Sequence, residues 1–269
     1  MADTTGMFAG SMPEFYQRCM VPMNFAPHAR ILASKLADMR AGEILEIAAG
    51  TGVVARELRA LLPEAVRVIA TDLNESMLEQ ARLQPEADRI EWRQAAADAL
   101  PFADKTFDAA ICQFGVMFFP DKPASFREAL RVLSPGCQYV FNVWDSLEHN
   151  VLGYTANQVM QHLFPSSRSS SHAVPFSYFD REIIRRELVS SGFTEPRFDV
   201  VSEFSRSPSA RIAATAYLHG GVLRHEIEAY GPGALERATD AFCEVLLNRF
   251  GPGEVQIPNQ AIIVTTSRA

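Results

Sequence analysis

The sequence predicts an α/β protein with a doubly wound, mostly parallel seven-stranded sheet. Between about residues 27 and 145, short apolar runs rich in β-branched residues alternate with helical patterns, which is typical of βαβ units. A turn with two glycines, Gly50-Thr51-Gly52, joins the first of these runs to the first crossover helix. The second half is richer in helical patterns but supplies two further strand-like runs. We therefore expect one sheet that is covered by helices.

The expected strands are short runs that alternate with amphipathic helical patterns. The strands are expected at residues 43–48, 66–71, 89–94, 107–112, 138–144, 196–203 and 261–266. Helices are expected at 27–40, 52–62, 74–83, 122–133, 180–191 and, with two glycine breaks, 207–250. Asn74 is a favourable N-cap for the third of these helices, and Gly192 is a favourable stop for the fifth.

Two connections are longer than is usual in an α/β domain: 146–179 after strand five and 205–253 after strand six. If strand six runs parallel to strand five, both leave from the carboxyl edge of the sheet, where open α/β sheets bind ligands. We therefore predict that both are helical lid insertions that shape a substrate pocket. The whole chain, 1–269, is expected to be a single domain, with an N-terminal helical segment or lid at 1–40 and a cofactor-binding core at 41–145.

Composition and charge narrow the class of partner. The 269 residues carry a formal net charge of −7, and the pI is near 5.4. This balance disfavours nucleic acid or an anionic membrane as the main partner, because both favour clustered Lys and Arg. The four cysteines are scattered without metal-ligand spacing, and residues 1–13 lack the pattern of a signal peptide. We expect a cytoplasmic protein that binds no metal; the oligomeric state stays open, with a homodimer among the alternatives.

Three loops contain residues suited to binding a nucleoside. Gly50 and Gly52 let the backbone turn sharply, and the helix that follows offers free N–H groups to a carboxylate or a phosphate. Asp72, twenty residues further on at the end of strand two, is placed to bind both hydroxyls of an adenosine ribose. Asp98 lies in a loop of small residues after strand three, where it can accept a hydrogen bond from an adenine amino group. These residues do not distinguish NAD from S-adenosylmethionine, because both contain that sugar.

The run from Glu46 to Gly136 resembles the core of class I S-adenosylmethionine-dependent methyltransferases. The resemblance is to the small-molecule group (methyltransferase type 11) that includes the ubiquinone/menaquinone C-methyltransferases. The matching segments are EIAAGTG at 46–52, ATDLN at 70–74, ADALPF at 97–102, FDAAICQFG at 107–115 and RVLSPG at 131–136. The resemblance implies a Rossmann-like methyltransferase fold, S-adenosylmethionine as cofactor with S-adenosylhomocysteine as product, and methyl transfer to a small molecule.

The resemblance also implies which residues contact the cofactor. Glu46 would support the glycine loop, Asp72 would hold the ribose, and Asp98 would read the adenine edge. Gln113 and Phe114 would lie beneath the methionine moiety and the transferring methyl group. The full expected set is Tyr16, Glu46, Ala48, Gly50, Thr51, Gly52, Asp72, Leu73, Asn74, Met77, Ala97, Asp98, Ala99, Gln113 and Phe114. Ala48 departs from the family pattern, which has glycine there, so we expect a slightly different backbone geometry.

The sequence identifies no catalytic base. A sulfonium methyl group is already strongly electrophilic, so the protein must mainly align the reactants and exclude water. A general base is needed only for a protonated acceptor, and the candidates are His149 and His219. Phe118, Trp144 and His149 are expected to line the substrate pocket, and the aromatic content favours an apolar or aromatic acceptor.

Two alternatives to a methyltransferase stay open. One is a non-catalytic S-adenosylmethionine-binding sensor or partner subunit, which would keep the cofactor residues and lack transfer. The other is a nicotinamide-dependent dehydrogenase. No tyrosine is followed by a lysine four residues later, which is one pattern that a dehydrogenase would use.

Overall fold

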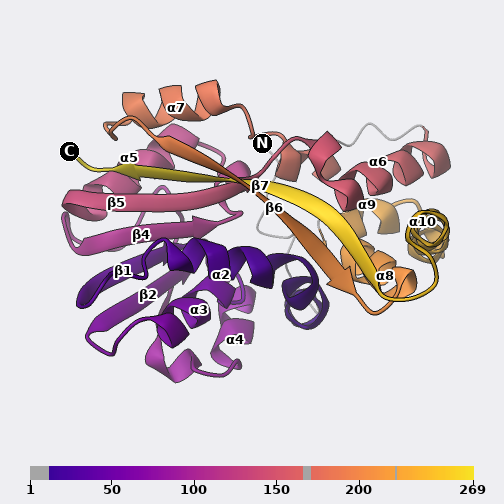
Figure 1. Ribbon diagram of the computed structural model, residues 1–269, viewed down its shortest axis with the longest axis horizontal. Coiled ribbons are helices and arrows are strands. Elements are labelled where there is room, and N and C mark those ends of the chain that lie inside the picture. The colour runs from indigo at the N-terminus through magenta and orange to yellow at the C-terminus, as the bar shows by residue number, and fades with distance from the viewer. Residues whose placement is uncertain (1–11, 166–170, 222) are drawn as a thin grey trace.

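The computed structural model describes residues 12–165, 171–221 and 223–269. Figure 1 shows a single twisted sheet with helices on both faces and a helical group beyond one end of the strands. The strands are β1 (Gly42–Ile47), β2 (Val66–Asp72), β3 (Glu91–Gln94), β4 (Phe107–Gln113), β5 (Leu133–Trp144), β6 (Arg197–Ser207) and β7 (Val255–Ser267). Their order across the sheet is β3-β2-β1-β4-β5-β7-β6.

The sheet is mostly parallel, as predicted. The first five strands pair in parallel, whereas β7 lies antiparallel to both β5 and β6. Strand β6 therefore runs in the same direction as β5, and the connections that follow these two strands leave from the same edge of the sheet. The expected placement of the two long connections required strand six to run parallel to strand five, and this condition is confirmed.

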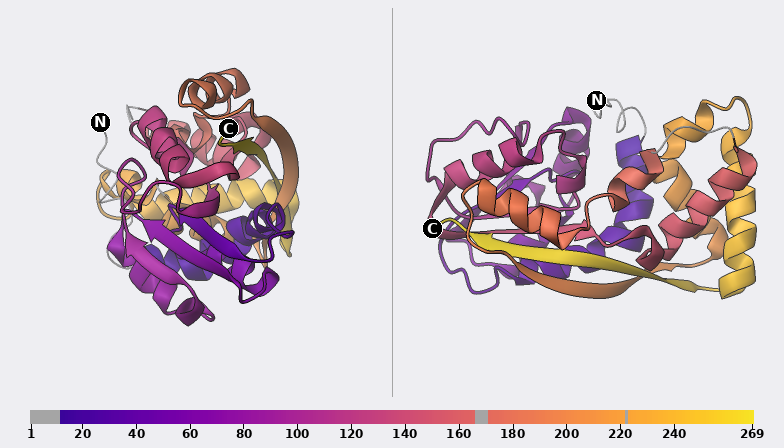
Figure 2. Two further views of the ribbon diagram at one scale, coloured as in Figure 1. Left: turned by 90° about the vertical axis from the view of Figure 1, so that its left-hand side faces the viewer. Right: turned by 90° about the horizontal axis from the view of Figure 1, so that it is seen from above.

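The helices are distributed over both faces of the sheet and its carboxyl edge (Figures 1 and 2). The α-helices are α1 (Met12–Phe15), α2 (Ala26–Ser34), α3 (Val53–Leu61), α4 (Glu75–Arg82), α5 (Lys122–Val132), α6 (Val151–Leu163), α7 (Arg181–Ser190), α8 (Ala210–Gly220), α9 (Leu223–Glu228) and α10 (Ala234–Phe250). The other helices are the π-helix η2 (Tyr16–Phe25) and the 3-10 turns η3 (Ala87–Arg89), η4 (Val116–Phe118), η5 (Leu147–His149) and η6 (Ser171–Phe176). No helix among the described residues is long and apolar enough to cross a membrane.

Alternating side chains of the parallel strands pack into two separate cores. Ile44 of β1 packs with helices α2 and α3 on one face, and the next residue, Leu45, packs with α5 on the other. The same alternation holds for Ala109 and Ala110 of β4. Successive side chains of a strand point to opposite faces, so apolar residues at every position require helices on both sides. This is the physical basis of the doubly wound arrangement.

Several elements differ from the sequence-based expectation, and three of them bear on the edge of the sheet where the long connections lie. Helix α2 ends at Ser34 rather than near residue 40, and a wide π-helix precedes it. Strand β7 begins at Val255, six residues before the expected start, although it contains Pro258. At Pro258 the strand pairs with β6 alone, since its pairing with β5 begins at Ala261. A proline without an N–H is tolerated where one side of the strand has no ladder bond to make.

The two long connections lie over the carboxyl edge of the parallel strands. Helix α6 comes from residues 146–179, and α8, α9 and α10 come from residues 205–253. Figure 2, in the right-hand view, shows these helices beside the N-terminal helical segment, at the opposite end of the molecule from the C-terminus. The fold thus places helices from three distant parts of the chain around the edge of the sheet where ligands are expected.

Candidate functional site

A cavity of about 320 Å³ opens at the carboxyl edge of the parallel strands. This volume falls within the usual range of small-molecule sites. Most of the predicted site residues line it: Tyr16, Glu46, Ala48, Gly50, Thr51, Asp72, Leu73, Asn74, Met77, Ala97, Asp98, Gln113, Phe114, Phe118 and Trp144. The loops that follow β1, β2 and β3 therefore meet at one site, which is the arrangement that the sequence predicted.

Four predicted residues do not line the cavity. Gly52 has a positive φ of 78°, and a Cβ atom there would lie 2.3 Å from the Trp92 ring, so this glycine permits close packing behind the loop. Ala99 is exposed and donates its N–H to the carbonyl of Ala96. His149 has a side chain that is 57% exposed and lies 3.1 Å from the Ser146 hydroxyl. His219 lies 3.1 Å from the Thr239 hydroxyl. The structure brings neither histidine to the cavity.

The glycine loop after β1 is held in a left-handed conformation. Gly50 and Ala48 both have a φ of 57°. This conformation is costly for alanine, by about 1–2 kcal/mol. A Cβ atom on Gly115 would come within 2.7 Å of the Ala48 Cβ, so the methyl group of Ala48 fits only because a glycine faces it from the loop after β4. The departure from the family pattern is therefore accommodated by local packing.

Asp72 ties the first loop to the second. The buried carboxylate of Asp72 accepts the N–H of Gly50 at 2.7 Å and the N–H of Asn74 at 2.8 Å. Burial raises the pKa of this carboxyl group, and the backbone N–H groups of Asn74, Gly50 and Leu73 oppose the shift. Asn74 begins helix α4 as predicted, but its side chain bonds Asp72 instead of capping the helix. An acidic group is thus fixed on the wall where two loops meet.

Glu46 is a second buried acidic group on this wall. Burial raises its pKa to about 8, although the N–H of Ala55 and the positive charge of Arg56 act in the opposite direction. Burial and the nearby Asp72 and Glu46 also raise the pKa of the Tyr16 hydroxyl, which therefore stays protonated at neutral pH. Two acidic groups and a neutral phenol form a wall suited to a ligand that carries positive charge.

Three polar atoms of the described residues are buried at this wall without a hydrogen-bond partner. They are Oε2 of Glu46, Oγ1 of Thr51 and Oε1 of Gln113. A buried polar atom without a partner costs roughly 1–3 kcal/mol. All three are oxygens that can accept hydrogen bonds, so the site fits a ligand with ammonium or hydroxyl donors, such as the amino acid and ribose parts of an adenosyl sulfonium.

The rest of the cavity is aromatic. The Phe114 ring lies flat on the Trp144 indole, with centroids 3.8 Å apart and planes 11° apart. Phe114 has a φ of 50°, and its N–H donates to the backbone and side-chain oxygens of Asn142. A left-handed conformation at an aromatic residue is rare and is typical of functional sites. Here it places the ring between the glycine loop and the aromatic part of the cavity.

Sequence reasoning missed most of the residues on this aromatic side. The π-helix η2 contributes Met20, Asn24 and Phe25, and its winding brings residues four positions apart to the cavity wall together with Tyr16. π-Helical segments are rare in proteins, and those that occur are often found at functional sites. Further lining residues on this side come from distant segments, among them Phe119, Asn150, Leu152, Pro175, Phe176, Ser205, Tyr217, Leu223 and Asn259. No local pattern in the sequence links these positions.

Comparison with known families places the central loops in a defined class. Residues 44–136 match the family model described as a methyltransferase domain. Over 103 residues the chain is 41% identical to the ubiquinone/menaquinone biosynthesis C-methyltransferase of Hahella chejuensis. Over 101 residues it is 39% identical to the corresponding protein of Klebsiella pneumoniae. These matches cover 36% of this chain and 41% and 40%, respectively, of the relatives, so they concern the central segment alone.

Solved structures resemble the whole fold. Phosphoethanolamine N-methyltransferase 2 of Haemonchus contortus, in complex with S-adenosyl-L-methionine, matches with a TM-score of 0.59 and 16% identity over 98% of this chain and 57% of that chain. A SAM-dependent methyltransferase of Thermotoga maritima matches with a TM-score of 0.56 and 18% identity over 96% and 98%. A [4+2]-cyclase also matches, with a TM-score of 0.55 and 17% identity over 91% and 81%. At these identities the likeness concerns the fold.

The class of the protein follows from the fold and the matched segment. Residues 44–136 match a methyltransferase domain, and the sheet that they help to build has the fold of class I, S-adenosylmethionine-dependent methyltransferases. Within this class, the matched segment resembles the ubiquinone/menaquinone C-methyltransferases, as the sequence indicated.

Proposed function

We propose that this protein transfers a methyl group from S-adenosylmethionine to a small apolar or aromatic molecule. The observation that carries the proposal is the single cavity at which the loops after β1, β2 and β3 meet and which continues into an aromatic region. When bound, S-adenosylmethionine supplies an electrophilic methyl group on a positively charged sulfur. The chain must then hold the nucleoside, orient the acceptor and exclude water.

We assign the nucleoside to the loops after β2 and β3. Asp72 is held by two backbone N–H groups and can accept hydrogen bonds from the ribose hydroxyls. Leu73, Asn74 and Met77 would flank the adenine, whereas Asp98 would accept a hydrogen bond from its amino group. The predicted cofactor set is retained as this proposal, except that Gly52 and Ala99 would act through the shape of their loops.

We assign the methionine part to the glycine loop and the end of β4. The unpartnered oxygens of Glu46, Thr51 and Gln113 would accept hydrogen bonds from the amino group of the ligand. Asp72, and Glu46 once the ligand has displaced its proton, would stabilise the positive charge of the ligand. Phe114 would lie between this part and the acceptor, where its ring helps to exclude water.

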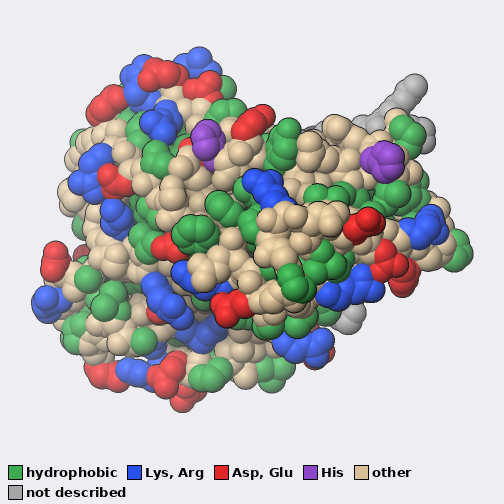
Figure 3. All heavy atoms as spheres, turned by 45° about the vertical axis from the view of Figure 1, so that its right-hand side comes forward, with side chains coloured by type: hydrophobic (Ala, Val, Ile, Leu, Met, Phe, Trp, Pro, Cys, Tyr) green, Lys and Arg blue, Asp and Glu red, His purple; other side chains and the backbone are tan. Residues whose placement is uncertain are grey.

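We propose that the two long connections and the N-terminal helices enclose the acceptor. Met20 and Phe25 of η2, Phe176 of η6, and Tyr217 of α8 line the cavity opposite the glycine loop. The position of these residues, opposite the glycine loop, supports the predicted division into a cofactor-binding core and lids. In Figure 3 the two signs of charge are intermixed on the visible face, which gives no support to a nucleic-acid or membrane partner. A cytoplasmic location stays a prediction, and the oligomeric state stays open.

Measurements of cofactor binding and of methyl transfer distinguish this proposal from its two alternatives, a non-catalytic sensor and a nicotinamide-dependent dehydrogenase. A match to a [4+2]-cyclase means that this fold by itself does not decide the reaction. Calorimetric titration of the full chain with S-adenosylmethionine, S-adenosylhomocysteine and NAD is the first test, and we expect binding of the first two only. Transfer of a labelled methyl group to apolar and aromatic acceptors is the second. Preferential binding of NAD would contradict the proposal in favour of a dehydrogenase, and cofactor binding without transfer to any acceptor would favour a sensor.

A further inference from the structure

A buried polar cluster lies in the otherwise apolar wall of the aromatic region. Asn24 comes from η2, Ser205 from β6 and Asn259 from β7, and all three line the cavity. Asn24 and Asn259 are each 6% exposed and Ser205 is 1% exposed. His28 of α2 is buried behind them, with its ring edge-on to both Phe114 and Trp144. Polar side chains brought together from four elements are costly to bury unless they have partners.

The hydrogen bonds of the cluster form a chain in which each group donates to the next, from His28 through Asn259 and Ser205 to Asn24. His28 Nε2 donates to Oδ1 of Asn259 at 2.8 Å, and burial lowers the pKa of this histidine, which keeps the ring neutral at pH 7. Asn259 Nδ2 donates to the Ser205 hydroxyl at 3.0 Å, and that hydroxyl donates to Oδ1 of Asn24 at 2.5 Å. Because Oδ1 of Asn24 is the acceptor, the amide nitrogen of Asn24 is left as a donor. Within the described part of the chain, this nitrogen takes part in no hydrogen bond.

The charges around the cavity separate into two regions. Its only charged residues among those described are Glu46, Asp72 and Asp98, and all three belong to the loops after β1, β2 and β3. We call the other side the acceptor compartment; it is lined by Asn24, Phe25, Trp144, Phe176, Ser205 and Tyr217. Among the described residues that line it, there is no Lys, Arg or His that would pair with an anionic acceptor and no Asp or Glu that would pair with a cationic one. A charged group buried there would lack a partner, which is strongly unfavourable.

We propose that the amide of Asn24, oriented by Ser205 and Asn259, binds one uncharged oxygen of the methyl acceptor while the Phe114–Trp144 pair packs against the apolar body of that molecule. The acceptor is then an uncharged molecule that carries a hydroxyl or carbonyl oxygen. Asn24 and Tyr217 are two of the donors that line the compartment, and burial raises the pKa of the Tyr217 hydroxyl, which keeps it protonated. This inference rests on the proposed function for the role of the bound molecule, but the binding preference can be tested without turnover.

The test compares phenol with toluene, which has nearly the same shape and lacks the oxygen. Each is titrated by NMR into the full chain saturated with S-adenosylhomocysteine. We expect the wild type to prefer phenol, and we expect Asn24→Leu to lose roughly three- to tenfold in affinity for phenol with no loss for toluene, the usual effect of one hydrogen bond. Ser205→Ala, which removes one of the two groups that orient Asn24, should lose part of the same preference. Ser125→Ala is the matched control, because its hydroxyl also lies at the cavity but donates to Asp121.

Further probes test the charge of the ligand. Benzoate and benzylamine should bind at least about tenfold more weakly than phenol, because the compartment offers no opposite charge. Equal losses for phenol and toluene in Asn24→Leu, unchanged phenol binding in both variants, or tight binding of a charged probe would overturn the proposal. A wild type that does not bind S-adenosylhomocysteine would contradict the proposed function instead. In that case, the phenol and toluene titrations of the ligand-free chain still test whether the amide of Asn24 binds an oxygen.

Discussion

The two sides of the cavity are built in different ways. The cofactor side uses short loops after adjacent strands and places Glu46, Asp72 and Asp98 within one stretch of the chain. The acceptor compartment combines the N-terminal π-helix, the ends of β5, β6 and β7, and two long connections, and it carries no charge among its described residues. The first is local in the sequence, and we propose that it binds a charged ligand, whereas the second depends on packing between distant segments. We therefore expect substitutions on the cofactor side to have large, specific effects.

The largest effect is expected where the glycine loop packs on the sheet. Gly52→Ala adds a methyl group that would overlap the Trp92 ring at a position with a φ of 78°, so we expect a loss of about 3 kcal/mol in the free energy of unfolding. Gly136→Ala is the matched control: it has the same φ and no atom within 4 Å of the added carbon, so the loss should be about 1 kcal/mol. Urea unfolding of both variants measures the difference. Equal losses would mean that backbone strain alone explains the effect.

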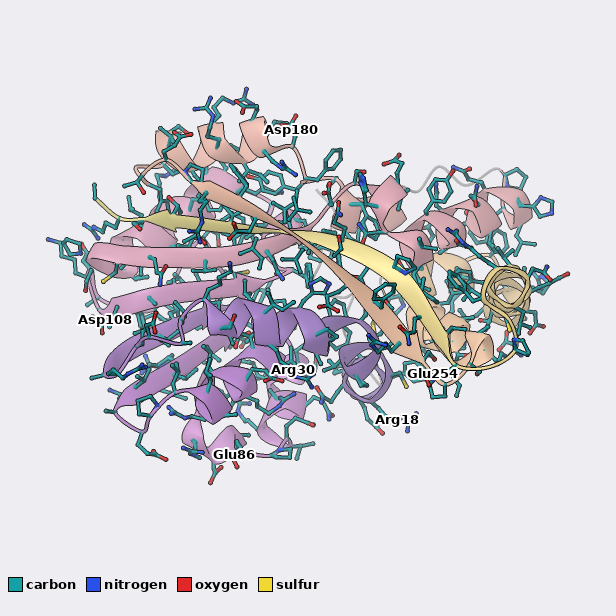
Figure 4. All side chains as sticks on the ribbon, viewed as in Figure 1. Arg18, Arg30, Glu86, Asp108, Asp180 and Glu254 are labelled. Atoms are coloured by element: carbon teal, nitrogen blue, oxygen red, sulfur yellow. The ribbon has the colours of Figure 1, made fainter. Side chains whose placement is uncertain are left out.

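Removal of the ribose ligand should have the next largest effect. Asp72→Ala removes the proposed acceptor of the ribose hydroxyls and leaves the N–H groups of Gly50 and Asn74 without their carboxylate. We expect the affinity for S-adenosylmethionine to fall by about 1.5–3 kcal/mol in calorimetry. Asp108→Ala is the control, since Asp108 accepts the N–H of Glu43 at the opposite edge of the sheet (Figure 4). Unchanged affinity in a folded Asp72→Ala protein would rule out the ribose assignment.

Binding of the cofactor should release a proton. The pKa of Glu46 is about 8 without ligand, compared with an ordinary value of 4.5, so the carboxyl group is mostly protonated at pH 7. A positively charged ligand favours the ionised form and lowers this pKa. The affinity for S-adenosylmethionine should therefore rise with pH between about 5.5 and 7, by up to tenfold per unit. This range lies below the pKa of an α-amino group, about 7.7–8.0, so the ligand itself does not titrate.

The stability of the ligand-free protein should change in the opposite sense. Because the folded state holds the Glu46 proton more tightly than the unfolded state, this residue makes the free energy of unfolding fall as pH rises from 4.5 to 8.

Calorimetry in buffers of different ionisation enthalpy counts the protons that are released when S-adenosylmethionine binds. Glu46→Gln should reduce both the number of protons released and the pH dependence of the affinity. Asp72, whose pKa is also raised, should still contribute to the proton release in this variant. Identical proton release in the wild type and Glu46→Gln would exclude Glu46 as the source.

The smallest effect concerns the alanine in the glycine loop. Ala48→Gly relieves a left-handed alanine but loses the contact of its methyl group with Gly115 and makes the unfolded chain more flexible, so the net gain in stability should be only about 0.5 kcal/mol. Ala49→Gly provides the comparison: Ala49 is buried and has no positive φ, so the same substitution there should cost about 1 kcal/mol. Thermal unfolding distinguishes the two signs. A loss of stability in Ala48→Gly would show that the Ala48–Gly115 contact outweighs the strain.

The meeting of the loops after β1, β2 and β3 could be predicted from the sequence because its signals are local. Gly50, Asp72 and Asp98 each follow a strand, and the carboxyl ends of parallel strands share one edge, so strand assignment was enough to bring them together. The acceptor compartment could not be found in this way. Asn24 and Asn259 are 235 residues apart, and their contact depends on β7 extending past Pro258 and on a π-helix that no periodicity indicated. His149 and His219 are base candidates through their position along the chain alone, and side-chain packing directs both to partners outside the cavity.

A crystal structure of the full chain with S-adenosylhomocysteine tests the central claim most directly. We predict that both ribose hydroxyls lie within hydrogen-bonding distance of the Asp72 carboxylate, that the adenine lies beside Asp98, and that the sulfur faces the Phe114–Trp144 pair. A nucleoside bound away from the loops after β1, β2 and β3, or a cavity that stays closed to it, would contradict the account.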